Sequence, residues 1–553
     1  MSYLRLVLHS SGASRTLLSF AALAGSLLAQ GGLPPVPVPP ENPITPAKAV
    51  LGKMLFWEEQ LSSDNRVACG TCHLPNRGGA DARRFPHPGS DQVAGTGDDT
   101  VGSAGVVRAD AANRYLPDPA FGLAQQITGR SSPTALVGAW FPELFWDGRA
   151  RSTFLDPETG QVAIVAGGAL ENQAAGPILS HVEMAHDGRT WAQVTTKLAA
   201  VRPLALGSNL PPDIAAALVA NPDYPSLFLA AFGTPGISAR RIAFAIATYE
   251  RTLVPDQTPW DLFQNGVVGA MTPAQVAGMN LFNGAARCNL CHTPGLFSDG
   301  QFRNLGVRPI AQDNGRQAVT GNFADRGRFK VPSLRNVGLR TSFMHTGQFV
   351  ALPQVLAFYN FGAGQNQDNK DPLLQPLGLA GAQFANLFDF VGNALTDPRV
   401  QNAQFPFDHP TLGGGAIPAE GIVYGTGSAA SGGRVPAMMA AVPANIGNVD
   451  FKLGVRNSLG GALATFALAV TAAVPGTQLQ GVNIHIDLGA PLLVTVPLRG
   501  AMGVAGTGYT TLATPVPDLP ALIGITLFGQ WFVWDAAVPA GAASSPGAEF
   551  RLR

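Results

Sequence analysis

Apolar residues recur at the spacing of amphipathic helices in the part of the chain before residue 410. In residues 47–61, AKAVLGKMLFWEEQL, the apolar side chains fall on one face of a helix. Similar patterns return in residues 213–222 and 239–254. We therefore predict a mainly α fold for this part of the chain.

Beyond residue 410 the pattern changes from helical spacing to alternation. In residues 481–488, GVNIHIDL, apolar and polar residues alternate, and the polar ones, including His485, are expected to face solvent. Two more strand-like runs, 490–498 and 529–538, lie between turns rich in Gly and Pro. We predict a separate C-terminal all-β domain with a sandwich-like fold.

The second helical unit repeats the theme of the first. Residues 272–292, TPAQVAGMNLFNGAARCNLCH, combine a Thr-Pro helix start, helical spacing and a C-x-x-C-H string, which the first unit also contains. This order indicates a diverged internal duplication. The predicted domains are two helical units at 47–265 and 266–409, a Gly-rich linker at 410–435 and the β domain at 436–553.

The N-terminus has the pattern of an export signal. Arg5 and Arg15 precede the run TLLSFAALAGSLLAQ, which is apolar and ends in small residues. This run is shorter than the roughly 20 residues that a membrane-spanning helix needs. We predict a signal peptide over residues 1–30, a Pro-rich linker over 31–46, and an exported, periplasmic protein that does not span the membrane.

The overall charge excludes some classes of partner. The chain has 553 residues, of which 46% are hydrophobic and 13% are charged, so it can bury a large core. Lys plus Arg and Asp plus Glu number 36 each, which gives a net charge of zero. A neutral chain gives no reason to expect binding to nucleic acid or to an anionic membrane surface.

The four cysteines occur in two strings, CGTCH at 69–73 and CNLCH at 288–292. A C-x-x-C pair alone fits a redox disulfide, half of a zinc site or the attachment of a haem. A redox pair does not require a following His, and zinc sites normally have their two pairs closer in sequence. In C-x-x-C-H, the thiols bind the vinyl groups of a c-type haem and the His binds its iron. The predicted covalent attachments of two haems are Cys69, Cys72, Cys288 and Cys291, and the predicted proximal iron ligands are His73 and His292.

Five strings between residues 48 and 363 carry a family resemblance. Among them are LGKMLFWEEQLSSDNRVACGTCH, SSPTALVGAWFPELFWDGRA, QAAGPILSHVEM and FMHTGQF. In this order they resemble the di-haem cytochrome c peroxidase family, which includes the MauG-type enzymes. The resemblance implies two mostly helical, cytochrome c-like haem domains. It also implies that the first haem reacts with hydrogen peroxide and that the second receives electrons from a donor.

The resemblance assigns roles to residues around the first haem. Trp146 takes the place of a Trp that relays electrons between the haems, and Gln173 and Glu183 take the places of a distal pair, with Pro177 between them. Cleavage of an O–O bond needs a group that moves a proton from one oxygen to the other. A carboxylate whose pKa is raised by an apolar pocket suits this task. We expect Glu183 to be this group.

The sixth iron ligand of the second haem has rival candidates. Met344, His345 and Tyr359 all follow the second haem string. The resemblance favours Tyr359, because it occupies the family's ligand position, where peroxidases usually have Met and MauG-type enzymes have Tyr. Tyrosinate stabilises ferric and higher iron states, so Tyr359 favours a MauG-like electronic structure. Met344 is the main rival.

The resemblance also implies a calcium site between the haem domains, built from an Asn and two carbonyl groups. The corresponding residues are Ser131, Arg340 and Ser342, so the Asn is missing and an Arg lies nearby. The loop 88–105, which contains several Asp residues, offers other hard oxygen ligands for Ca²⁺. These departures weigh against the family site and leave the binding of calcium open.

Three functions are compatible with these motifs. The leading hypothesis is a peroxidase that reduces hydrogen peroxide with electrons from a small cytochrome c or copper protein. A MauG-like oxidase acting on a protein or a small organic substrate is the alternative among enzymes. A non-catalytic electron-transfer or sensor cytochrome is the alternative outside them, but it leaves Gln173 and Glu183 without a purpose. Family members are often dimers, so the resemblance allows a homodimer.

Overall fold

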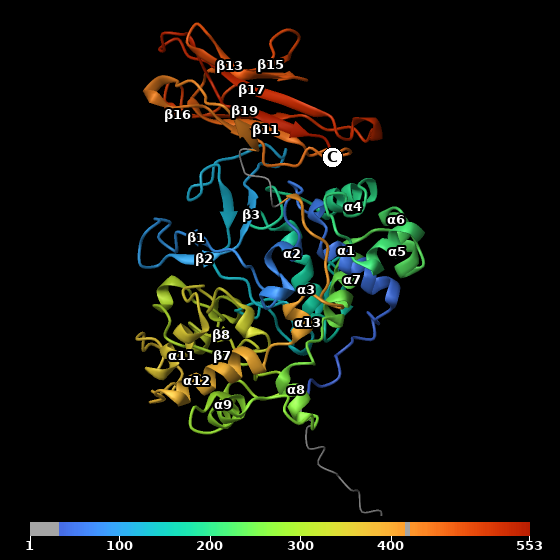
Figure 1. Cartoon of the computed structure of the whole chain (residues 1–553), viewed down its shortest axis with the longest axis vertical. Coiled ribbons are helices and arrows are strands. Elements are labelled where there is room, and N and C mark those ends of the chain that lie inside the picture. Colours follow the sequence, from blue (N-terminus) through green and yellow to red (C-terminus); the bar gives the residue numbers. More distant parts are fainter. Residues whose placement is uncertain (1–31, 415–420) are drawn as a thin grey trace, which may run out of the picture.

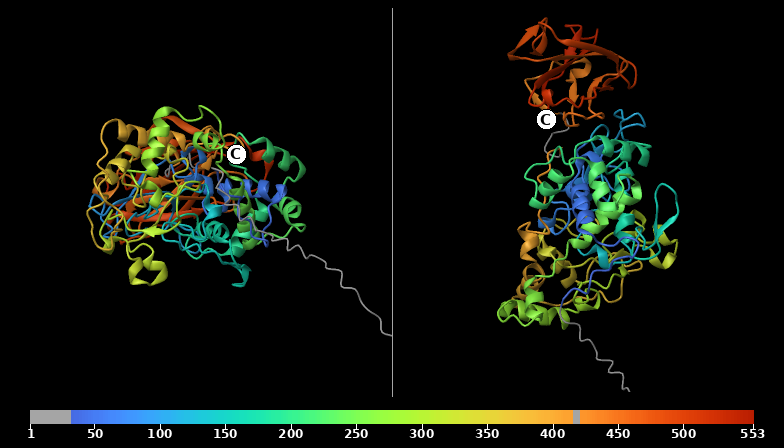
Figure 2. Two further views of the ribbon diagram at one scale, coloured as in Figure 1. Left: turned by 90° about the horizontal axis from the view of Figure 1, so that it is seen from below. Right: turned by 90° about the vertical axis from the view of Figure 1, so that its right-hand side faces the viewer.

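The computed structural model describes residues 32–414 and 421–553. Three regions follow one another along the longest axis of the molecule (Figure 1). The first helical region, from α1 to α7, lies in the centre; the second helical region, from α8 to α12, lies at one end; and the strand-rich region, from β9 to β19, lies at the other (Figures 1 and 2). The predicted signal peptide and residues 415–420 of the predicted linker lie outside the described residues.

Two long helices form the core of the first helical region. α1 (Pro46–Phe56) begins after Thr45, whose side chain caps the first turn. It packs against α7 (Ala239–Thr252). Gly52 permits this contact, because a Cβ there would lie 1.8 Å from the carbonyl oxygen of Ala245. The other helices are α2 (Cys69–Cys72), α3 (Ala169–Ala175), α4 (Trp191–Ala200), α5 (Pro212–Ala220) and α6 (Tyr224–Phe232).

Aromatic residues form the core of the second helical region. Phe282, Phe297 and Phe390 meet edge to face, with ring centroids 5.4–6.2 Å apart. α9 (Pro273–Asn283) packs against α12 (Ala382–Asp389) beside this cluster. The other helices are α8 (Pro259–Gln264), α10 (Gln317–Thr320) and α11 (Leu352–Asn360). α13 (Pro398–Gln401) returns to the first helical region, where Val400 joins the hydrophobic core (Figure 1).

Both helical regions also contain long irregular segments and short antiparallel strand pairs, so helices are only part of their structure. These pairs join distant loops rather than forming a common sheet. They are β1 (Phe85–His87) with β2 (Thr100–Gly102), β3 (Ala104–Val107) with β4 (Gln125–Ile127), β5 (Phe154–Leu155) with β6 (Val162–Ile164), and β7 (Phe302–Arg303) with β8 (Phe329–Lys330).

The strand-rich region is a separate C-terminal unit built from antiparallel sheets. One sheet has the strand order β15-β12-β17-β19-β9, with β18 also pairing β17; a second has the order β10-β11-β16; and β13 pairs β14. Trp531 and Phe466 lie in a buried core with Val455 and Leu453 of the second sheet. The strands are β9 (Ile422–Tyr424), β10 (Ala437–Met439), β11 (Lys452–Leu459), β12 (Leu463–Ala469), β13 (Ala472–Leu479), β14 (Val482–Ile486), β15 (Leu492–Pro497), β16 (Ala505–Ala513), β17 (Thr526–Trp534), β18 (Ala542–Ser544) and β19 (Gly547–Arg551).

The expectation for His485 is wrong. The alternation of β14 predicts a solvent-facing imidazole, but His485 is buried. Its Nε2 lies 2.7 Å from the carbonyl oxygen of Thr426, and Gly425 packs directly against the ring. The segment after β9 therefore covers the side of β14 that the local pattern would leave exposed.

The strand-rich region contacts the first helical region through charged groups. Lys197 on α4 pairs with Asp450 at 2.7 Å, and the ammonium of Lys452 lies over the ring of Tyr115 at 4.6 Å. Within the described ranges, no helix combines the length and the apolar character needed to cross a membrane.

Candidate functional site

The first C-x-x-C-H string lines a cavity of about 530 Å³ in the first helical region. α2 carries Cys69 and Cys72, and His73 is the C-cap residue that follows the helix. The Nδ1 of His73 lies 3.1 Å from the carbonyl oxygen of Gly79, which fixes the ring and leaves Nε2 free to bind a metal. Burial lowers the pKa of His73, so the imidazole is neutral, the form that ligates iron.

The cysteine environments do not fit a redox pair. None of the four cysteines forms a disulfide. Burial raises the pKa of Cys72 to about 12 and that of Cys69 further, whereas reactive C-x-x-C pairs have lowered thiol pKa values. The two pairs also line different cavities, so they do not form one zinc site. Two half-buried thiols and an oriented imidazole at a roomy cavity fit a c-type haem.

The predicted distal residues line this same cavity. Gln173 comes from α3, Pro177 begins the 3₁₀ turn Pro177–Leu179, and Glu183 lies in the turn that follows. Burial raises the pKa of the Glu183 carboxyl, opposed by a hydrogen bond from Ser180. The three residues named from the sequence therefore line the same cavity as His73.

Strand β3 holds the Glu183 turn in place. The backbone amide of Val106 donates to the carbonyl oxygen of Glu183 at 3.2 Å. A Cβ on Gly105 would lie 2.0 Å from the carbonyl oxygen of Val182, so only a residue without a side chain allows this approach. Arg149, which the sequence prediction did not include, also lines the cavity and lowers the pKa of Glu183 through its charge.

Trp146 lies between the two cavities and lines both. It is 8% exposed, and its indole nitrogen donates to the carbonyl oxygen of Ser131 at 2.8 Å. The ring contacts His345 of the second helical region, with centroids 6.3 Å apart. The predicted relay residue is therefore fixed at the boundary between the two sites.

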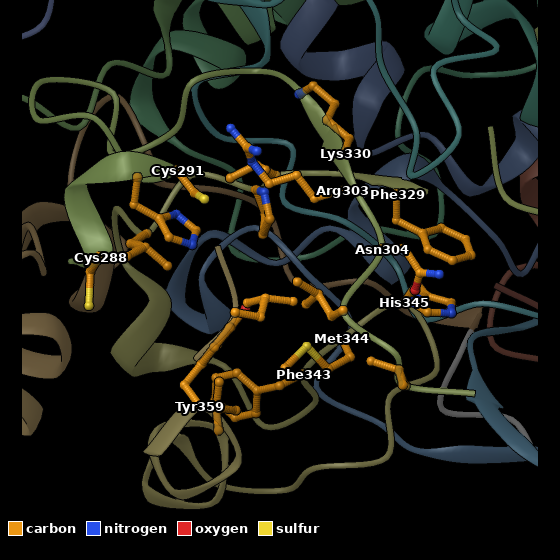
Figure 3. Close-up of a pocket in the computed structure, with 18 of the residues that line it drawn as sticks. Cys288, Cys291, Arg303, Asn304, Phe329, Lys330, Phe343, Met344, His345 and Tyr359 are labelled. Carbon is orange, nitrogen blue, oxygen red and sulfur yellow. The ribbon is translucent and has the colours of Figure 1, made fainter. Parts of the chain in front are cut away.

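The second C-x-x-C-H string lines a cavity of about 190 Å³. Figure 3 shows Cys288 and Cys291 at one side of it, with Met344 and Tyr359 across the cavity. His292 also lines it, with its Nδ1 3.0 Å from the carbonyl oxygen of Phe297. This arrangement repeats that of His73, so it too fits a c-type haem.

Both candidates for the sixth ligand reach the second cavity. Tyr359, on α11, lines it, and burial raises the pKa of its phenol. Met344 has a φ of 65°, a left-handed conformation that is uncommon for residues other than Gly. His345 lies farther along the cavity, stacked on Phe329 with centroids 3.6 Å apart.

The second string is more exposed than the first. In the first string Gly70 and Thr71 are buried, and Trp57 packs directly on Gly70. In the second string Leu290 is 49% exposed and Arg287 is also exposed. A cofactor held by the second string therefore lies nearer to the surface.

The residues at the family's calcium position do not fit the ion. Calcium takes six to eight oxygen ligands. Here the guanidinium of Arg340 donates to the carbonyl oxygens of Ser132 (2.9 Å) and Ser342 (3.2 Å). Ser131 offers only a hydroxyl, 3.3 Å from that of Ser342. A fixed cation thus lies against one of the expected calcium ligands, the carbonyl oxygen of Ser342.

The Asp-containing loop does not offer a second calcium site. The carboxylate of Asp98 accepts hydrogen bonds from the backbone amides of Ser90 and Asp91 and from the hydroxyls of Ser90 and Thr96. These bonds lower the pKa of Asp98 and use its oxygens within the loop. In residues 32–414 and 421–553, no group of three His, Cys, Asp or Glu side chains is arranged to hold a metal ion.

Lys330 is a further residue that sequence reasoning missed. It lines the second cavity, and its ammonium lies 3.4 Å from the ring centroid of Phe141. Burial lowers the pKa of Lys330 to about 7. Lys330 lies in the string FKVPSLRN (residues 329–336), but its neighbour Phe141 is far away in sequence, so the local pattern gave no reason to select it.

Residues 46–268 match the sequence profile of a family described as di-haem cytochrome c peroxidase. The cytochrome-c peroxidase IdrP1 of Pseudomonas sp. (strain SCT) is 28% identical over 417 residues, covering 69% of this chain and 88% of that protein. The methylamine utilization protein MauG of Methylorubrum extorquens is 30% identical over 370 residues, covering 66% of this chain and 82% of that protein. The cytochrome c551 peroxidase of Nitrosomonas europaea is 27% identical over 382 residues, covering 64% and 92%.

Proposed function

Because the chain belongs to the di-haem cytochrome c peroxidase family, we propose that it reduces hydrogen peroxide to water with electrons from a small cytochrome c or copper protein. It is an oxidoreductase that uses haem. We propose that both haems are c-type and covalently bound, through the two C-x-x-C-H strings. The observation that carries the peroxidase proposal is the convergence of His73, Gln173 and Glu183 on one cavity.

Haem bound in the first cavity supplies the iron at which the peroxide bond is broken. Glu183 accepts a proton from one peroxide oxygen and donates it to the other, which leaves as water. Gln173 orients peroxide by hydrogen bonding, and Pro177 fills the apolar side of the pocket. Two electrons and two protons convert one peroxide into two waters.

Electrons enter at the second site in this proposal. The exposed side chains of Arg287 and Leu290 beside the second string support docking of a donor protein there. Trp146, in contact with His345 and lining both cavities, then relays electrons to the first site. We further propose a periplasmic location, which the apolar N-terminal run supports.

The experiment that tests the proposal follows the oxidation of a reduced small cytochrome c by the purified two-haem protein after addition of hydrogen peroxide. Peroxide-dependent oxidation at a rate proportional to enzyme is expected. A protein with both haems that binds peroxide yet never oxidises any reduced cytochrome or copper protein, even after reductive activation, would not be a peroxidase of this kind.

Tyr359 is the observation that favours a MauG-like oxidase as the second candidate function. We expect Tyr359→Phe to raise the reduction potential of one haem by about 60 mV or more, a tenfold change in the reduced-to-oxidised ratio, because a phenolate stabilises ferric iron. Spectroelectrochemistry measures this shift, and Tyr509→Phe on β16 is the control. An unchanged potential and spectrum would assign the ligand elsewhere, with Met344→Leu as the next variant to measure.

Trp146→Phe is expected to slow electron transfer between the haems about tenfold, or ~1.4 kcal/mol in activation free energy. Phe is harder to oxidise than Trp and cannot donate to the Ser131 carbonyl oxygen. Stopped-flow mixing of fully reduced protein with peroxide should then show a fast change at the first haem and a delayed reoxidation of the second. Trp140→Phe, outside both cavities, should behave as the unmodified protein, and equal delays in both variants would remove Trp146 from the path.

A further inference from the structure

Arg340 is a half-buried cation at the junction of the two haem cavities. It follows the 3₁₀ turn Val337–Leu339 and lines the second cavity. Its guanidinium reaches across to the first site, where Nη2 donates to the carbonyl oxygen of Ser132, a residue of the first cavity wall. One side chain thus connects the walls of both cavities.

The surroundings of Arg340 form a connected unit. The backbone amide of Ser131 donates to the carbonyl oxygen of His345 at 2.8 Å, and the indole of Trp146 donates to the carbonyl oxygen of Ser131. Arg340 binds the next carbonyl in this segment and also that of Ser342. The cation therefore holds together the segments that carry the predicted relay residue and its neighbour in the second region.

No carboxylate of the described residues pairs with this guanidinium. Its hydrogen bonds go to neutral carbonyl groups. Burial lowers the pKa of Arg340 to about 10, so the group remains charged at neutral pH. An unneutralised charge in the interior is costly unless a bound anion or a function compensates for it.

We infer that the guanidinium of Arg340 is a built-in cation that replaces calcium at the junction between the two haem cavities. The carbonyl oxygen of Ser342, one of the expected calcium ligands, accepts a hydrogen bond from Nε instead, and Nη2 holds the carbonyl oxygen of Ser132, next to the Ser131 that replaces the family's Asn. A calcium ion at this place would be repelled by the guanidinium. Unlike calcium, this charge cannot be removed by a chelator. The inference rests on the proposed function only in assuming that both cavities hold haem.

The first test measures calcium directly on the two-haem protein. Calcium content is determined by atomic emission after desalting, and the absorption spectrum and both reduction potentials are recorded with added CaCl₂ and with added EGTA. We expect substoichiometric calcium and the same spectrum and potentials in both conditions. One retained calcium per chain, whose removal by EGTA changes either potential, would overturn the inference.

The second test changes the charge. Arg340→Met removes it at similar length and is expected to lower at least one haem potential by ~59 mV, a tenfold change in the reduced-to-oxidised ratio. Loss of a nearby positive charge favours the oxidised, more positive haem. Arg340→Lys, which keeps the charge without the planar fork, should shift the potential less. Arg77→Met, at an exposed Arg beside the first string, is the matched control.

The outcomes separate the inference from the proposed function. If Arg340→Met leaves both potentials where they are, Arg340 is not the working cation and the inference is wrong. If that variant does not fold, the calcium and EGTA measurements on the unmodified protein still decide. A protein that shows the expected calcium result and the expected potential shift but never turns over peroxide refutes the peroxidase proposal. The inference about Arg340 is unaffected by that outcome.

Discussion

Replacing Glu183 by Gln is expected to lower peroxide turnover by a factor of about 10²–10⁴, the usual contribution of a positioned general acid and base. The amide keeps the size and hydrogen-bonding capacity of the side chain but cannot accept the peroxide proton. Covalent haem content and the spectrum of the second haem should not change. Steady-state oxidation of a reduced donor measures the loss, and Glu41→Gln, at an exposed carboxylate, is the control.

The pH profile gives an independent reading of the same group. Burial raises the pKa of Glu183, so the protonated form, which cannot accept a proton from peroxide, persists to higher pH than for an ordinary Glu. Turnover should therefore fall as the pH drops through this raised pKa. The acidic limb of the profile should be absent in Glu183→Gln. A variant that keeps full turnover, or the same acidic limb, would show that another group moves the proton.

Local sequence signals predicted some elements well. Thr272 and Gln275 form a capping box at the start of α9, as the Thr-Pro start indicated. The apolar residues of 481–488 are buried at Val482, Ile484 and Ile486, as alternation predicts. These features depend on hydrogen bonds and burial within a few residues, so a short stretch of sequence contains the information.

Contacts between distant segments account for what the sequence did not predict. His485 is buried because the segment after β9, about 60 residues earlier, lies on it. Arg340 finds its carbonyl partner at Ser132, 208 residues away. Neither periodicity nor spacing encodes such a contact. The sequence analysis could note only that an Arg lies near the calcium position, not that its guanidinium occupies it.

The site residues were predicted partly from local sequence and partly from family resemblance. The C-x-x-C-H strings follow from chemistry alone, because the string itself brings two thiols and an imidazole together. Gln173, Glu183 and Trp146 were selected by family resemblance, and the position of Glu183 at the cavity that they share depends on the close approach of β3 at Gly105.

The double variant Cys69→Ser/Cys72→Ser is expected to carry one covalent haem instead of two and to lose peroxide turnover to background, a fall of about 10³ or more. A serine hydroxyl does not add to a haem vinyl group, so no covalent bond to haem forms at the first string. Denaturing mass spectrometry counts the attached haems. The matched variant Cys288→Ser/Cys291→Ser should lose the other haem.

The two double variants should lose different reactions. The protein without the second haem retains His73, Gln173 and Glu183 around the first cavity, so it should still react once with peroxide but receive no further electrons from a donor. The protein without the first haem should still be reduced by the donor but should not react with peroxide. If both variants retained two covalent haems, the strings would not be the attachment sites. If both lost the same reaction, the division of labour between the two cavities would be wrong, because peroxide chemistry and electron uptake would then share one site.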